Sequence, residues 1–143
     1  MVAAKAKVKS KKFATEPLNG SFLFANGDRY VGQYRNSDKS AILRHGQGLQ
    51  TSASNVVYQG DWENDVMCGQ GRMDFPSGDS YVGEFKENQF HDQGTYYWAN
   101  GSFFTGSFQK NRLLGNGTFT TTNGQSWVGE FNCNEVLGLK LLL

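Results

Sequence analysis

The sequence has little cysteine and proline, and it has no long apolar run. Its two cysteines, Cys68 and Cys133, exclude a disulfide framework and lack metal-ligand spacing, so we expect two reduced thiols. Only 2 prolines beside 18 glycines exclude a collagen-like chain. No apolar stretch approaches the roughly 20 residues of a membrane-spanning helix. Residues 1–12 carry lysines where a secretory signal needs apolar residues, which predicts a cytoplasmic protein.

Charge is distributed unevenly along the chain. Residues 1–19 contain five lysines and one glutamate, a net charge of +4, whereas residues 20–143 carry 9 basic and 12 acidic side chains, a net charge of −3. We therefore expect a lysine-rich arm at residues 1–19 and a folded body at residues 20–143. The lysines of this basic arm are Lys5, Lys7, Lys9, Lys11 and Lys12.

An aromatic-x-Gly-x-aromatic motif recurs five times. The last four copies are spaced by 23 residues, and the first gap is 28 because five extra residues lie within the segment 36–45. A fixed period of this length is the signature of a repeat architecture. The five copies are Tyr30 to Tyr34, Tyr58 to Trp62, Tyr81 to Phe85, Phe104 to Phe108 and Trp127 to Phe131.

Two further signals keep a constant distance from this motif. Three residues before each leading aromatic lies a turn residue, in three copies the glycine of Asn-Gly, which predicts hairpins with both turn residues at φ > 0. The second signal is a Gly-x-Gly pair after the motif, such as Gly69-Gln-Gly71. It begins another strand, on which Met73 and Phe75 share one face. The turn residues are Gly27, Asn55, Gly78, Gly101 and Gly124.

These patterns predict an all-β fold, an elongated twisted antiparallel ribbon of stacked β-hairpins. Each repeat has one aromatic and one polar face, and the glycines leave slots that neighbouring aromatic rings fill. Residues 138–143 begin like a sixth repeat, with Gly138 at the position of a glycine pair. We interpret this segment as a half-repeat, one strand that caps the array. The alternative is a frayed tail.

The complete pattern, from Gly20 to Phe131, resembles the MORN repeat. Residues 69–143 look closest to the short MORN-repeat proteins of testis, a resemblance carried by the segments 81–88 and 91–96 and by the closing Leu-Lys-Leu of residues 139–141. Repeat two departs from the pattern, since it lacks the turn glycine and has Gln50 and Ser52 where Met or an aromatic residue is expected. The resemblance implies a MORN array and a role as a scaffold or adaptor, as in cilia, flagella and membrane junctions.

The sequence shows no catalytic constellation. His45 and His91 share a repeat position, but the strand spacing would place them roughly 19 Å apart, too far for one metal site. The Gly-x-Gly pairs lack the strand–loop–helix context and the Lys-Ser/Thr of phosphate-binding loops. We therefore expect no enzyme activity, no metal and no cofactor.

The aromatic face needs a cover, which can be its own twist, a partner helix or another copy of the chain. Because aromatic residues are favoured anchors at interfaces, we predict a partner-binding groove for a helical or extended segment of a protein partner. The alternative is that these rings only pack the core of the array. The predicted groove residues are Tyr58, Trp62, Tyr81, Phe85, Phe104, Phe108, Trp127 and Phe131.

The basic arm has three interpretations: a solvated tail, a contact with an acidic filament surface such as a microtubule, or a contact with anionic lipid. Because the body is acidic, we expect no nucleic-acid partner. The leading hypothesis is a non-enzymatic protein-binding scaffold or adaptor in a cytoskeletal assembly, the ciliary or flagellar axoneme, within a large complex. The alternative is a peripheral module that binds anionic membranes.

Overall fold

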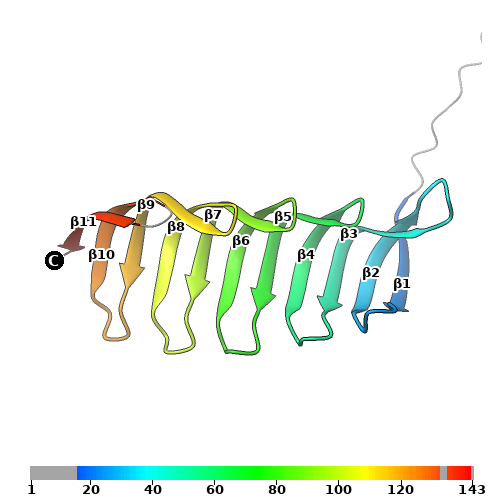
Figure 1. Cartoon of the computed structure of the whole chain (residues 1–143), viewed down its shortest axis with the longest axis horizontal. Coiled ribbons are helices and arrows are strands. Elements are labelled where there is room, and N and C mark those ends of the chain that lie inside the picture. Colours follow the sequence, from blue (N-terminus) through cyan, green and yellow to red (C-terminus); the bar gives the residue numbers. More distant parts are fainter. Residues whose placement is uncertain (1–15, 133–134, 143) are drawn as a thin grey trace, which may run out of the picture.

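The computed structural model describes residues 16–132 and 135–142, which form one antiparallel sheet of eleven strands (Figure 1). The strands follow one another in the sheet in chain order, so each pairs only with its neighbours in sequence. These residues contain no helix, and hence none long and apolar enough to cross a membrane. The strands are β1 (Leu18–Leu23), β2 (Arg29–Asn36), β3 (Ile42–Thr51), β4 (Val57–Glu63), β5 (Val66–Asp74), β6 (Ser80–Lys86), β7 (Gln89–Tyr97), β8 (Phe103–Gln109), β9 (Arg112–Thr120), β10 (Ser126–Asn132) and β11 (Glu135–Leu142).

Five hairpins and one closing strand make up this sheet. The hairpins β1–β2, β3–β4, β5–β6, β7–β8 and β9–β10 are the five expected repeats, and β11 follows as the expected half-repeat. Figure 1 shows them side by side in an elongated array. The predicted all-β array of stacked hairpins is therefore confirmed. Residues 1–15, with all five lysines of the basic arm, lie outside the described residues.

The turn inside each repeat differs from the expected geometry. In the first repeat Phe24 N–H donates to Asp28 O (2.8 Å) and Gly27 N–H donates to Phe24 O (2.9 Å), which closes a three-residue loop. Gly27 has φ 91°, but Asn26 is not among the residues with positive φ. The prediction of two such residues is wrong, because this loop is a type I turn followed by a single left-handed residue. Asn55 takes that position in repeat two, with φ 64°.

The two-residue turns with both residues at positive φ lie instead between consecutive repeats. They are Asn64–Asp65, Glu87–Asn88 and Lys110–Asn111. Their second residue also bonds to the preceding hairpin: Asn111 N–H donates to Phe90 O (3.2 Å), and Phe90 N–H donates to Asn111 Oδ1 (2.8 Å). Sequence analysis missed these turns, although Asp or Asn recurs there every 23 residues.

The extra residues of the first repeat lengthen the hairpin between β2 and β3. Asn36 pairs with Ile42, and residues 37–41 form a loop in which Ser40 has φ 60°. Gly32 still pairs with Gly48, as the corresponding glycines do in the other repeats. The insertion therefore protrudes at one rim and leaves the central register of the array unchanged.

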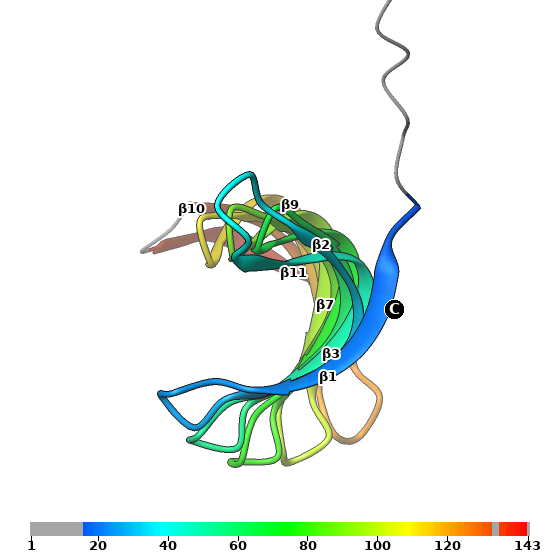
Figure 2. The same cartoon turned by 90° about the vertical axis from the view of Figure 1, so that its right-hand side faces the viewer.

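A continuous line of paired glycines crosses the sheet. Each strand from β1 to β10 contributes one glycine, directly opposite the glycine of its neighbour. Because this line has no side chains, the strands can bend sharply along it. Figure 2, which looks along the array, shows the resulting C-shaped cross-section. The glycine line consists of Gly20, Gly32, Gly48, Gly60, Gly71, Gly83, Gly94, Gly106, Gly117 and Gly129.

In the first four repeats the leading aromatic lies over this line and fills the space that two glycines leave. A Cβ atom at Gly71 would lie 2.6 Å from a ring carbon of Tyr58. The Tyr58 hydroxyl donates to the carbonyl oxygen of Asp61 at 2.9 Å, and the Tyr81 hydroxyl donates to that of Glu84 at 2.9 Å. The predicted filling of the glycine slots by aromatic rings is confirmed in repeats one to four, whereas Gly129 in the fifth repeat faces Leu139.

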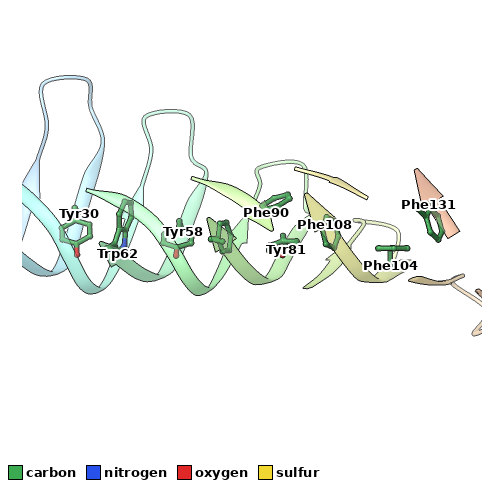
Figure 3. Packing of buried hydrophobic residues seen from close by; sticks show 9 residues of the cluster. Tyr30, Tyr58, Trp62, Tyr81, Phe90, Phe104, Phe108 and Phe131 are labelled. Atoms are coloured by element: carbon green, nitrogen blue, oxygen red, sulfur yellow. The ribbon is translucent and has the colours of Figure 1, made fainter. Parts of the chain in front are cut away.

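Neighbouring repeats are joined by a row of aromatic rings, here called the ring chain, along the inside of the curved sheet (Figure 3). The trailing aromatic of each repeat contacts the leading aromatic of the repeat before it. Successive centroids are 4.7–5.7 Å apart and the planes nearly perpendicular, an arrangement that favours aromatic pairs beyond their burial. In order, the ring chain is Tyr30, Trp62, Tyr58, Phe85, Tyr81, Phe108, Phe104 and Phe131.

Candidate binding site on the concave face

Seven of the eight predicted groove residues belong to the ring chain and are buried. Tyr81 is 0% exposed, Phe104 1% and Trp62 4%, because each ring is enclosed by its neighbours and by the bent sheet. The eighth, Trp127, is half-buried and lies outside the ring chain. Direct contact of these eight residues with a partner stays a prediction, but a molecule on the concave face meets a different set of side chains first.

That set is a layer of half-buried apolar residues packed against the ring chain, here called the upper layer. Its members come from the inward-facing positions of the odd-numbered strands and from the adjoining turns. Several of them touch one another, as Tyr96 and Trp98 do with ring centroids 5.1 Å apart. The upper layer consists of Phe22, Phe24, Met67, Met73, Phe75, Tyr96, Trp98, Leu113 and Phe119.

An apolar hollow of about 170 Å³ opens in the upper layer between repeats four and five. Tyr96, near the end of β7, and Trp98, just after that strand, form one wall of the hollow. Leu113 of β9 lies in the opposite wall, at the other rim of the sheet. Tyr96 and Trp98 hold the repeat positions of Met73 and Phe75, which sequence analysis placed on one face but not at a site. Sequence analysis missed Leu113, although residues 44, 67, 90 and 113 recur at the 23-residue spacing. The lining residues are Phe90, Tyr96, Trp98, Phe108, Asn111 and Leu113.

The N-terminal end of the concave face is polar where the rest is apolar. Arg44 occupies the repeat position of Met67, and its side chain is only 17% exposed. The guanidinium lies 4.2 Å from the centroid of Trp62 and bonds to Asp65 at 2.6 Å. It also donates to Gln50, the residue that replaces an aromatic in repeat two. This paired cation covers the ring chain there, so the open apolar surface lies toward the C-terminal repeats.

Two phenols of this face differ in depth: Tyr30, in the first repeat, is fully buried, and Tyr96, in the fourth repeat, is half-buried. The Tyr96 hydroxyl donates to Asp79 Oδ2 at 2.8 Å, and burial, with this bond, raises the pKa of Tyr96 to about 12. Burial also raises the pKa of Tyr30 to about 12, with Arg44 acting in the opposite direction. Burial likewise raises the pKa of Tyr58 and of Tyr81.

We expect alkali to unfold the array as these phenols ionise. An unfolded tyrosine with a pKa of 10.0 loses its proton before a buried one with a pKa of about 12. The folded state therefore binds more protons over that interval, and stability falls from pH 10 to about 12. Circular dichroism and tyrosinate absorbance, followed together, should change in one transition. Ionisation of all 6 tyrosines near pH 10 with an unchanged sheet signal would contradict this expectation.

The described residues contain no group of three or more His, Cys, Asp or Glu side chains that could hold a metal ion. Burial, with Glu63 and Asp61 nearby, raises the pKa of the Cys68 thiol. The low thiolate content that follows does not favour nucleophilic chemistry at Cys68. The partners expected for the basic arm are an acidic filament surface or anionic lipid. Both depend on residues outside the described part of the chain and stay predictions.

Comparison with known proteins shows which kind of repeat this chain resembles. The MORN repeat model matches residues 58–80, 81–103 and 104–126. No curated protein sequence matches the chain, so the likeness of residues 69–143 to the short MORN-repeat proteins of testis stays a prediction. Among solved structures, the TCP domain of SAS-4 (dCPAP) of Drosophila melanogaster, in complex with a proline-rich motif of Ana2 (dSTIL), is similar with a TM-score of 0.34 and 14% identity, over 100% of this chain and 97% of that chain. The three consecutive matches support a place for this chain in the MORN-repeat family, with which its open sheet of stacked hairpins is consistent.

Proposed function

We propose that this chain is a non-enzymatic binding module that holds a segment of a partner protein on its concave face. MORN repeats are repeats that bind proteins or membranes. One observation favours a protein partner for this chain. The apolar hollow is bounded by Tyr96 and Trp98, whose side chains stay partly exposed although they pack against the buried ring chain. An apolar cavity of about 150 Å³ takes a benzene-sized group, so this hollow of about 170 Å³ has room for one apolar side chain.

The experiment is selection from a phage-displayed random peptide library against the full chain, followed by affinity measurements on the selected peptides. Replacement of Trp98 by alanine should weaken binding at least about tenfold, since aromatic anchors in desolvated pockets dominate interface energies. Leu113→Ala removes the opposite wall without touching an indole and should act in the same direction. Circular dichroism of each variant checks that the sheet is intact.

The matched control is Tyr97→Ala. Tyr97 is the neighbour of Trp98 in the chain, but its side chain lies on the outer face, 40% exposed beside Phe103. Peptides that bind the concave face should be indifferent to this change. Peptides that lose affinity with Tyr97→Ala and not with Trp98→Ala or Leu113→Ala would place binding on the outer face and refute the proposal.

The wider setting that we propose is a scaffold or adaptor in the cytoplasm, within a cytoskeletal assembly of the cilium or flagellum. This part rests on the resemblance to MORN-repeat proteins that occur there. Crosslinking mass spectrometry on native extract would identify the partner. Crosslinks between axonemal proteins and the concave face are the expected result, and a partner set without cytoskeletal proteins would remove this setting while leaving the binding site in place.

A further inference from the structure

The turn Lys110–Asn111 stands beside the apolar hollow, and its flanking strands present different chemistry on their two faces. Phe108 pairs with Leu113, and both line the apolar hollow on the inside. Gln109 pairs with Arg112 one position nearer the turn, so their side chains point to the outside. The same rim is therefore apolar on its inner side and polar on its outer side.

The outer side of this rim holds a second hollow, of about 480 Å³, lined by Gln89, Gln109, Lys110 and Arg112. Its lining contains two cations and two amides and no carboxylate. The ion pairs of the described residues involve Arg44, Arg72 and His91. Among the side chains that the structure describes, Lys110 and Arg112 thus have no acidic partner, and two positive charges lie exposed within one turn of the apolar hollow.

The corresponding turns of the two preceding repeats do not share this charge. The turn after β4 carries Glu63 and Asp65, and the turn after β6 carries Lys86 and Glu87. From repeat two to repeat four the formal charge of the rim therefore changes from two negative to neutral to two positive. The cationic turn coincides with the apolar hollow, whereas Asp65, at the other end, is bonded to Arg44.

We infer that the partner is an acidic peptide segment whose apolar anchor enters the hollow at Trp98 and Leu113, and whose neighbouring Asp or Glu binds Lys110 and Arg112 across the rim. The inference rests on the proposed function and specifies its partner. A guanidinium binds a carboxylate through two parallel hydrogen bonds, which suits Arg112 to this role. The net charge of −3 on residues 20–143 disfavours a long polyanion such as nucleic acid.

The test compares peptides selected from a phage-displayed random library on the full-length chain and on the charge-reversed variant Lys110→Glu/Arg112→Glu. Peptides selected on the unmodified chain should carry Asp or Glu next to an apolar residue. Their affinity should fall at least about tenfold on the reversed variant and should weaken with added salt. The reversed variant should in turn select Lys or Arg at the same place. Circular dichroism confirms that both proteins are folded.

The matched control is Arg29→Glu/Lys39→Glu, which changes the net charge by the same amount at exposed positions of the N-terminal repeat. An equal loss of affinity in this control would show a general charge effect and overturn the inference. Peptides that depend on Trp98 but are insensitive to the reversal would also overturn it, while the proposed function would stand. If no peptide binds the concave face and anionic phospholipid vesicles bind instead, through Lys110 and Arg112, both proposals fall.

Discussion

Replacement of Gly94 by alanine is expected to lower the free energy of unfolding by about 3 kcal/mol, because the added methyl group has no space to occupy. Gly94 lies in the glycine line between Gly83 and Gly106. An added Cβ would lie 2.5–2.6 Å from ring carbons of Tyr81, which is 0% exposed and cannot swing away. Urea denaturation followed by tryptophan fluorescence and circular dichroism measures the loss.

Gly101→Ala is the matched control for this prediction. Gly101 has φ 93° in the turn of the same repeat, and an added Cβ would have no atom within 4 Å. Gly101→Ala should lower the free energy of unfolding by only about 1 kcal/mol, the cost of holding an alanine in the left-handed region. Comparison of the two variants therefore separates steric conflict from backbone strain. A Gly94→Ala variant that is as stable as Gly101→Ala would show that the Tyr81 ring can move away from the glycine line.

Phe85→Ala is expected to destabilise the array by about 3–5 kcal/mol, the usual cost of removing a buried phenylalanine. Phe85 is 4% exposed and lies between Tyr58 of the preceding repeat and Tyr81 of its own, with centroids 4.9 and 5.2 Å away. Its removal interrupts the ring chain in the middle. Because a repeat array is held together by contacts between neighbours, amide exchange should accelerate on both sides of the gap, from β4 to β7.

Tyr97→Ala removes a ring of similar size from the outer face and is the control for Phe85→Ala. Its side chain is 40% exposed, so we expect a loss below about 1 kcal/mol and unchanged amide exchange elsewhere. Equal effects of the two substitutions would contradict the assignment of the inner ring chain as the element that couples the repeats.

The repeat pattern was sufficient to predict the array, since its signals are local. The alternation of Tyr58, Gly60 and Trp62 places three positions on one face of a strand whatever the remaining fold, and Asn55 or Gly78 marks where that chain reverses. The turn type was harder to predict. The same Asn-Gly pair suits a two-residue and a three-residue loop, and only the pairing of Leu23 with Arg29 decides between them.

The aromatic face was predicted from the sequence, but the depth of its side chains was not. An aromatic concave face was expected, yet the residues chosen for it, such as Tyr81 and Phe104, are its buried layer. Strand periodicity separates one face from the other but cannot rank depth within a face. Trp98 and Leu113 remain accessible because they lie farther from the bend than the rings of the motif.

The sequence alone therefore determined the number of repeats, the alternation of each strand and the closing segment, because these depend on side-chain order and turn chemistry over a few residues. Only the tertiary structure decided that one glycine from each of ten strands forms a single line, since this alignment depends on the register of every pair. The bend at that line buries the motif rings, and it leaves the upper layer and the cations at Lys110 and Arg112 for a partner to contact.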